Sequence, residues 1–476
     1  MDVMLTYDGE AMGALNSAAI MALINQHQEN QVPTFEKNMD YYLGKHEILE
    51  KERSESDAPN AQPVCNHAKD IADTASGYFM GNPITYKLAG DEEDGRIKKA
   101  FDRLMDAFDD ATVDDDDQEN ALMLSIEGKT YEYIYAAEDV AELREKPIDP
   151  QNAFLVYDQS IEHKELFGVY YYTKKNDLDP DGEQEDVWYV LVMTETELKY
   201  YEIPKDSEDD VLPYLVEPHN LGYVPLVEYK NNRFAIGDFE QQIGLIDAYN
   251  TMTADRINDK EQFIDAILVI YGALLGDGGD ESDQAQEELR QKKLLELPID
   301  AKAEYLVRQL DESGMETLRD ALKEDIYTFS HVPNLTDENF AGNSSGVAME
   351  YKLLGLEMLT KTKERWYRRG LRKRLNIFLY YLGLQGSILS EKDIEVQFSR
   401  SLPKNLLEIS QIIGNLEGEV SQRTLISLLP FVEDPDAELA ALEAEEANTT
   451  AQQISEFGFT NEAGADNTEP EEIDAE

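Results

Sequence analysis

Cysteine is almost absent from the sequence, because Cys65 is the only one among 476 residues. A single thiol excludes an internal disulfide bond and every metal site built from several cysteines. Long apolar runs are also lacking: the longest near-apolar stretch, residues 266–275, is far short of the roughly 18–20 residues of a membrane span. The N-terminus does not carry the positive charge of a signal peptide. We therefore expect a soluble protein that is made in a reducing cytoplasm and contacts no membrane.

Basic residues are scarce relative to acidic ones. The chain has 42 Lys and Arg against 99 Asp and Glu, which gives a formal net charge of −57. Such a chain repels the phosphates of nucleic acid, so tight DNA binding over the whole surface is excluded. No Walker A loop is present, which excludes a P-loop ATPase. The carboxylates lie mostly in predicted loops and on polar helix faces, whereas a two-metal nuclease needs them on a rigid core. We predict no catalytic residue, no metal site and no cofactor.

The remaining composition is that of a globular protein. Hydrophobic residues make up 42% of the chain, with 26 Tyr and 16 Phe, enough for about two to four domains at this length. Two dense acidic runs, residues 114–117 and 277–283, do not match the calcium-binding loop pattern. We expect both runs to be solvated turns, and the first to interrupt a helical pattern over residues 101–124.

A β-rich module is predicted between two helical parts of the chain. Residues 128–229 change from a helical period to the alternation of a strand. Acidic turns that contain Gly and Pro separate the alternating segments. The predicted strands cover residues 129–136, 152–157, 166–173, 187–194, 197–203 and 224–229.

A helical hairpin with an insert at its tip follows. Residues 238 to about 272 show a long helical pattern, and a second helix is predicted over residues 315–329. The insert between them contains two predicted strands, residues 292–297 and 305–309. Pro333 should stop the second helix near His331 and open a polar loop. Ser344 or Ser345 can cap the next helix, predicted over residues 347–384.

The second half of that long helix is basic. Helical spacing spreads the basic side chains around much of the helix, and the acidic chain offers many partners. We interpret the run mainly as salt bridges within or between subunits; contact with DNA and a solvated face are the alternatives. The run comprises Lys361, Lys363, Arg365, Arg368, Arg369, Arg372, Lys373 and Arg374.

Four blocks of sequence resemble the portal proteins of long-tailed, siphovirus-type bacteriophages. The most specific are DAYNTMTADRINDKEQFIDAILVIYG and SHVPNLTDENFAGNSSGVAMEYKLLGLE, and the supporting ones are YYLGKHEIL and NHAKDIADTASGYFMGNPITY. The resemblance spans residues 35–400 in order. It implies a ring, usually dodecameric, at one vertex of the capsid, through which double-stranded DNA is packaged and later ejected. The subunit would assemble in the host cytoplasm and remain in the virion.

The resemblance also implies partners and an α+β portal fold. Expected partners are the terminase packaging motor, a head-completion or adaptor protein, capsid and scaffold proteins, and DNA held weakly and without sequence specificity. A capsid-associated scaffold without a channel is the alternative, but it would be mostly helical. The implied regions are the wing (1–238 and 347–401, the latter including the long helix), stem helices (239–272 and 313–331), clip (273–312), tunnel loop (332–346), crown (402–442) and an acidic, disordered tail (443–476).

Three groups of site residues follow from the resemblance. In the tunnel loop, Asn and Ser side chains offer neutral donors for weak phosphate contacts, while Asp337 and Glu338 oppose tight binding. Residues facing DNA would be His331, Asn334, Asp337, Glu338, Asn339, Phe340, Asn343 and Ser344. Stem residues would be Asp247, Asp255, Asn258, Asp259 and Lys260, and clip residues for docking would be Lys292, Lys293 and Tyr305.

Overall fold

The computed structural model contains helices and sheets that fall into two compact units. The first unit comprises residues 1–342 and 351–401, and the second comprises residues 343–350 and 402–476. The structure describes residues 4–52, 59–89, 95–137, 142–174, 187–205, 210–263, 267–271, 302–306, 312–335, 346–400, 406–429, 432, 435, 437–442 and 444.

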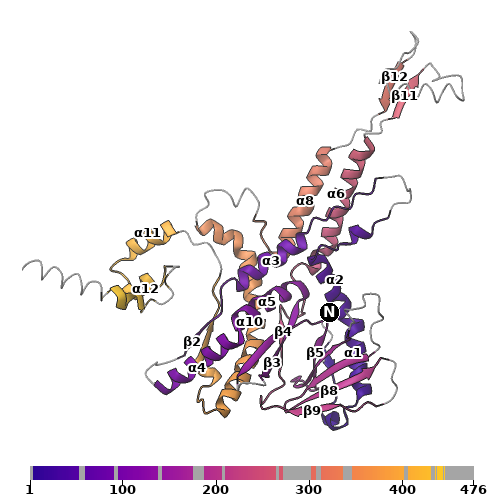
Figure 1. The fold of residues 1–476 in the computed structure, drawn as a ribbon. Coiled ribbons are helices and arrows are strands. Elements are labelled where there is room, and N and C mark those ends of the chain that lie inside the picture. The colour runs from indigo at the N-terminus through magenta and orange to yellow at the C-terminus, as the bar shows by residue number, and fades with distance from the viewer. Residues whose placement is uncertain are drawn as a thin grey trace, which may run out of the picture. The chain divides into compact units, whose positions relative to one another are not determined.

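In the described part of the first unit, the strands form two larger sheets and two shorter pairs (Figure 1). The six-stranded sheet has the order β1-β5-β6-β7-β8-β9, in which β1 is parallel to β5, and the three-stranded sheet has the order β10-β3-β4. The remaining pairs are β11-β12 and β13-β2. The strands are β1 (Leu5–Thr6), β2 (Thr85–Leu88), β3 (Lys129–Ala136), β4 (Leu143–Ile148), β5 (Ala153–Tyr157), β6 (Glu165–Tyr172), β7 (Val187–Met193), β8 (Glu197–Pro204), β9 (Leu215–Pro218), β10 (Leu226–Lys230), β11 (Ile267–Tyr271), β12 (Lys302–Leu306) and β13 (Ile394–Gln397).

Side-chain alternation places the two larger sheets face to face. On β6, Val169 and Tyr171 belong to a core that Ile20 and Ile24 cover from the N-terminal helix. Tyr170 points to the opposite face and packs on a core shared by the two sheets. The other face of the three-stranded sheet joins a third core, lined by helices. The order of layers is therefore helix, six-stranded sheet, three-stranded sheet and helices.

Helices α1 and α3 begin at side-chain caps. Asn16 accepts a hydrogen bond from the Ala19 N–H, and Asn66 accepts one from the Lys69 N–H, both at 3.0 Å. The helical elements are η1 (Gly9–Ala14), α1 (Ser17–Asn30), α2 (Val32–Tyr42), η2 (Glu47–Glu50), α3 (His67–Met80), α4 (Gly95–Ala111), α5 (Val113–Glu127), η3 (Glu240–Gln242), α6 (Ile243–Phe263), α8 (Glu312–Ser330), α10 (Gly346–Leu384, whose first turn belongs to the second unit) and η4 (Glu391–Asp393).

The expected break at residues 114–117 is wrong. The helix break lies at Thr112, which adopts the left-handed conformation with φ 58°, and α5 begins at Val113. The acidic run forms the first turn of α5, where negative charge interacts favourably with the helix dipole. The expectation of a solvated turn also fails, because Asp116 and Asp117 are buried.

The first helix of the predicted hairpin is shorter than expected. Its α-helix ends at Phe263, and by Ile267 the chain has become strand β11, which pairs in antiparallel register with β12. Three β-branched residues in the run ILVIY favour a strand once a partner is available. The second predicted strand of the insert overlaps β12, while the first, residues 292–297, lies outside the described residues. Figure 1 shows α6 and α8 side by side, leading to β11 and β12.

The described part of the second unit includes two short helices after residue 402. They are α11 (Leu406–Leu416) and α12 (Gln422–Ile426), and an isolated bridge between Glu417 and Val420 separates them. The long helical pattern expected after Pro403 is therefore interrupted. Within the described ranges, no helix combines the length and hydropathy needed to cross a membrane.

Candidate functional site

Helix α10 carries the predicted basic run and packs on the helix-lined core of the first unit. Its inner face contributes Tyr367, Leu371 and Phe378 to that core. Gly370 lies on the same face, where a Cβ atom would stand 2.4 Å from the ring of Tyr229. The missing side chain allows Tyr229 to stack on Tyr367, with ring centroids 4.4 Å apart. The core itself therefore fixes the position of this helix.

Arg374 is fully buried on α10 and three buried carboxylates surround it. Its guanidinium lies 2.7 Å from Asp117 and 3.2 Å from Glu145, and it also bonds Glu132. These acids come from α5, β4 and β3, so the cluster joins α10 to three other elements. Two tyrosine hydroxyls donate further hydrogen bonds, Tyr367 to Asp117 and Tyr229 to Glu132.

The cluster has more acids than its single cation can balance. With all three carboxylates ionised, it would carry two negative charges in excess of the guanidinium. Burial raises the pKa of Glu145 well above its ordinary value, and the charges of Glu132 and Asp117 raise it further against the opposing effect of Arg374. We infer that the folded protein keeps the Glu145 proton at pH values where the unfolded chain releases it.

Glu145→Gln should therefore weaken the pH dependence of stability. Because the raised pKa means that the folded state binds a proton that the unfolded state loses, the wild-type free energy of unfolding should fall by up to about 1.4 kcal/mol per pH unit above pH ~4.3. The variant keeps a neutral group of similar size, so its free energy should fall less and exceed that of the wild type at about pH 8. Urea unfolding across pH measures both quantities.

Glu142→Gln is the matched control for this prediction. Glu142 lies directly before the same strand, is partly exposed, and pairs with Arg144 at 3.5 Å. Its substitution should leave the slope of stability against pH close to that of the wild type. Equal slopes for the wild type and Glu145→Gln would contradict a protonated Glu145.

Lys363 forms another buried ion pair of α10. Its ammonium bonds the carboxylate of Asp238 and donates to the Ser125 hydroxyl at 2.8 Å. Asn231 donates to the other oxygen of Asp238 at 2.9 Å, and both charged side chains are almost fully buried. Asp238 lies two residues before η3, which leads into α6. The pair therefore fastens α10 to the beginning of α6.

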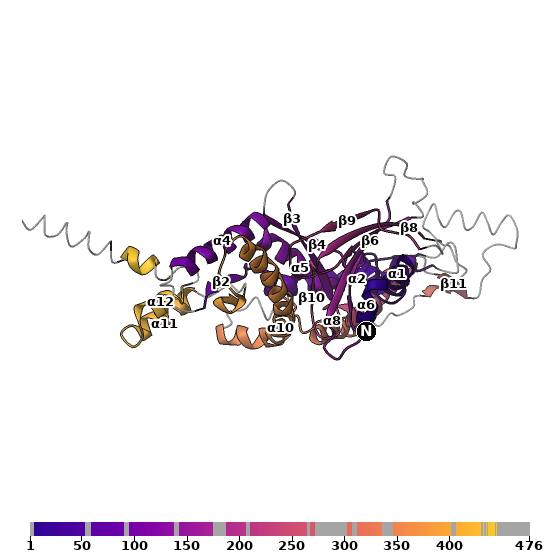
Figure 2. The same ribbon diagram turned by 90° about the horizontal axis from the view of Figure 1, so that it is seen from below.

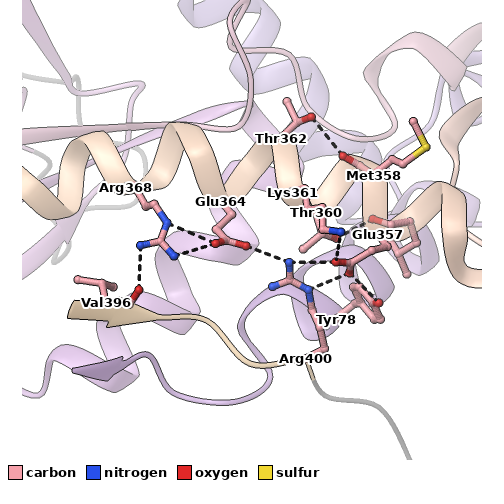
Figure 3. Close-up of polar contacts among 11 residues, drawn as sticks. Tyr78, Glu357, Met358, Thr360, Lys361, Thr362, Glu364, Arg368, Val396 and Arg400 are labelled. Atoms are coloured by element: carbon pink, nitrogen blue, oxygen red, sulfur yellow. Dashed lines mark hydrogen bonds and ion pairs between the residues drawn. The ribbon is translucent and has the colours of Figure 1, made fainter. Parts of the chain in front are cut away.

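A third group of ion pairs involves Glu357, Glu364 and Arg368 of α10 (Figure 3). Arg400, which follows β13, donates to Glu357 at 2.9 Å and to Glu364 at 3.0 Å. Arg368 donates to Glu364 at 2.8 Å, and Tyr78 of α3 donates to Glu357 at 3.0 Å. Partial burial alone would raise the pKa of Glu357, but the bonds from Arg400 and Tyr78 outweigh it and lower the pKa. These contacts hold the segment after β13 against α10.

The other members of the basic run lie nearer the surface. Arg365 is exposed, and so are Lys361, Arg369 and Arg372. The interpretation of the run as salt bridges within the chain agrees with the pairs of Lys363, Arg368 and Arg374. Further contacts within the chain join Lys361 to Glu357, Arg372 to Glu391, Lys373 to Glu165 and Arg369 to the ring of Trp366.

The predicted stem residues of α6 mostly contact the N-terminal segment. Asn258 is buried, Asp259 is half-buried and Lys260 is exposed. Three of the five predicted residues bind groups from residues 41–61, which fixes the helix to that segment. These are Asp247 with the Tyr41 hydroxyl at 2.7 Å, Asp255 with Lys51 at 3.0 Å, and Asn258 with the Ala61 N–H at 2.7 Å.

Helix α8 is held both by α6 and by α3. Arg256 of α6 lies 2.6 Å from Glu316 of α8. Tyr327 of α8 donates to Asp70 of α3 at 2.7 Å, and the ring of His67 lies 3.2 Å from the same hydroxyl. The α6–α8 hairpin is therefore attached to the first unit at its base by polar contacts from two directions.

Only the beginning of the predicted tunnel loop is described. Helix α8 ends at Ser330, and His331 follows in the left-handed conformation with φ 60°. The His331 carbonyl oxygen approaches Gly355 of α10, where a Cβ atom would stand 3.4 Å away. Asn334 is half-buried. The predicted residues outside the described part are Asp337, Glu338, Asn339, Phe340, Asn343 and Ser344.

The predicted clip residues are largely outside the described part. Lys292 and Lys293 lie there. Tyr305 belongs to β12, where its backbone is paired with Leu268 of β11. The structure therefore places one of the three residues, on a two-stranded pair at the tip of the hairpin.

Sequence reasoning missed the acidic partners of α10. A signal was present, because Arg374 falls on the same helix face as Leu371 and Phe378, and an inward charge requires a buried partner. The identity of that partner could not be read, since Asp117 and Glu132 lie about 250 residues away in sequence. Within the described part of the chain, no group of His, Cys, Asp or Glu is arranged to hold a metal. The three carboxylates converge on a guanidinium instead.

Comparisons with known proteins match nearly the whole chain. Residues 22–452 match the family model described as "Phage portal protein, SPP1 Gp6-like". The "Portal protein" of Bacillus phage SPP1 is 25% identical over 486 aligned residues, which cover 97% of this chain and 92% of that protein. The "Portal protein" of Clostridium phage phiCD119 is 23% identical over 447 aligned residues, covering 87% of this chain and 93% of that protein.

Proposed function

Because the chain belongs to the SPP1 Gp6-like family of phage portal proteins, we propose how each of its regions serves a DNA-conducting ring. Portal proteins are structural components of the phage capsid that oligomerise, and they act in DNA packaging. The chain is therefore a portal protein with an α+β fold and is not an enzyme.

The ring is proposed to be a dodecamer that encloses double-stranded DNA. The net charge of −57 supports a passage that repels phosphate and does not grip it. Contacts with DNA are then weak, independent of sequence and confined to few residues. The ring assembles in the host cytoplasm, where it meets capsid and scaffold proteins.

The observation that carries this proposal is the α6–α8 hairpin with a β-pair at its tip. Helices α6 and α8 are joined by Arg256 and Glu316 and anchored at the base of the hairpin to α3 and to residues 41–61. We assign these helices to the stem. The tip, which includes β11, β12 and the region 273–312, forms the clip and presents Lys292, Lys293 and Tyr305 to the terminase motor and later to a head-completion protein.

The remaining regions follow the order of the chain. Residues 1–238 and 347–401 form the wing, with α10 as its central support. Residues 332–346 form the tunnel loop, which contacts the DNA and prevents it from slipping back. Residues 402–442 form the crown. Residues 443–476 have no assigned role.

Replacing Asn334 and Asn343 together by Ala should impair packaging and leave the ring intact. Each Asn offers a neutral donor to phosphate, and a hydrogen bond of roughly 1 kcal/mol corresponds to about a five-fold change in an equilibrium constant. The amount of packaged DNA per particle, measured in a phage that carries the variant, tests this. Native mass of the purified variant reports on assembly, and normal DNA filling would remove the loop from the mechanism.

A further inference from the structure

The exposed face of α10 forms a continuous stripe that the first unit leaves uncovered. We define the outer stripe as Tyr351, Leu354, Met358, Arg365, Arg369 and Arg372, all exposed. They recur at intervals of three, four or seven residues, which places them on one side of the helix. The opposite side carries the buried residues of the core. The outer stripe is thus a surface of the folded unit.

The outer stripe is unusual in both its apolar and its charged half. Tyr351, Leu354 and Met358 are 75%, 52% and 65% exposed, although they are large and apolar. The arginines that follow form a basic surface in a chain of net charge −57. Exposed apolar side chains beside arginine are typical of protein interfaces. DNA phosphates would satisfy the arginines and leave the apolar half uncovered, so a protein partner fits better.

An acidic surface lies elsewhere on the same unit. Between Leu104 and Gly128 the sequence has no Lys or Arg. The exposed acids of this stretch lie on the second half of α4 and the first half of α5. We define the acidic corner as Asp106, Asp109, Asp110, Asp114, Asp115 and Glu119.

Helices α4 and α10 meet through their apolar sides, where the rings of Phe108 and Phe378 have centroids 4.9 Å apart. Leu104 and Phe108 of α4 pack into the same core as Leu371 and Phe378 of α10. Figure 2 shows α4 and α10 as separate helices of the unit. Because each helix turns its apolar side inward, its charged side faces away from the other helix. One chain therefore cannot bring its own outer stripe onto its own acidic corner.

We propose that the outer stripe of one subunit binds the acidic corner of the neighbouring subunit in the ring. A contact between two different surfaces of the chain is head-to-tail, and repeated head-to-tail contacts build a ring when the rotation between subunits closes. Complementary charge also offsets, locally, the repulsion between copies that each carry −57. The inference rests on the proposed ring and adds which surfaces hold it together.

A charge exchange between the two surfaces tests this contact. Arg365→Glu, Arg369→Glu and Arg372→Glu together should lower the fraction of chain in the ring about ten-fold or more, measured by mass photometry. Asp106→Lys, Asp109→Lys and Asp110→Lys together should do the same. The chain that carries all six changes restores the complementary pairing and should recover the ring.

Controls distinguish loss of this contact from loss of folding and from a general effect of added negative charge. Lys45→Glu, Lys164→Glu and Arg233→Glu alter three other exposed basic residues by the same charge and should leave the ring fraction unchanged. Urea midpoints of all variants should match that of the wild type. The inference alone is overturned if the ring persists in either reversed variant, which is the result expected if the stripe binds DNA. It is also overturned if the chain with all six changes does not recover the ring. A wild-type chain that forms no ring at any salt concentration overturns the proposed function as well.

Discussion

Arg374→Met is expected to destabilise the protein by on the order of 3–5 kcal/mol, because it removes the only cation from a buried cluster of three acids. Met keeps much of the volume of the Arg side chain, so the loss reflects charge and hydrogen bonding more than packing. Asp117 and Glu132 would remain buried without their main partner. Urea unfolding of the purified chain measures the change.

Arg144→Met is the control for Arg374→Met. Arg144 lies beside Glu145 on β4, but its side chain is 44% exposed and lies 3.5 Å from Glu142. Exposed pairs contribute about 0–1 kcal/mol, so this substitution should change stability little. Equal losses in the two variants would mean that the buried cluster has no special role.

A compensated variant keeps this test decisive if Arg374→Met does not fold. Combining it with Asp117→Asn, Glu132→Gln and Glu145→Gln removes the buried charges together with their cation. Replacing every member of a buried ion pair by neutral groups lowers stability much less than removing one partner and leaving the other charged. The combined variant should therefore recover a large part of the lost stability, whereas no recovery would show that the charge imbalance is not the cause.

Lys363→Met is expected to cost a similar amount, on the order of 3–5 kcal/mol, because Asp238 would remain buried without its cation. The effect should reach α6, since Asp238 lies two residues before η3, which leads into α6. Hydrogen exchange of the amides at the beginning of α6 should accelerate more than that of the six-stranded sheet. Urea unfolding and hydrogen exchange measured on one sample report both consequences.

The same helix supplies the control for Lys363→Met. Lys361 is 63% exposed and lies 3.4 Å from Glu357, so Lys361→Met should change stability by about 0–1 kcal/mol. The double variant Lys363→Met with Asp238→Asn should be more stable than Lys363→Met alone, because it removes the unpaired charge. If the double variant is no more stable than Lys363→Met, the loss of stability comes from altered packing and not from the unpaired charge of Asp238.

Much of the fold could be read from local pattern. Every strand predicted between residues 128 and 229 is present within about two residues, because Tyr- and Val-rich alternation with Gly- and Pro-containing turns is a strong signal. Strands β4 and β9 were missed. The sequence of β4, LREKPI, contains three charged residues and a proline, and it becomes a strand because β3 offers a pairing edge. Pairing of this kind is a tertiary effect that a local pattern does not reveal.

The end of α6 shows the same limit. The helical pattern of apolar residues in α6 continues into the residues of β11. These residues form a strand because the segment Lys302–Leu306 pairs with them in antiparallel register. For the ion pairs of α10, the sequence indicated which type of residue takes part but not which acids are the partners. The basic run of α10 indicated salt bridges, but the burial of Arg374 and Lys363 depends on helices and strands that are distant in sequence.

The native mass of the purified chain, followed by images of any large species, tests the central claim most directly. In roughly 1 M salt the Debye length falls to about 3 Å, so repulsion between chains of −57 is largely screened. The account predicts a species whose mass is a whole multiple of 54.1 kDa and whose images show a closed ring with a central opening. A chain that stays monomeric at every salt concentration, or an assembly without an opening, would contradict a DNA-conducting ring.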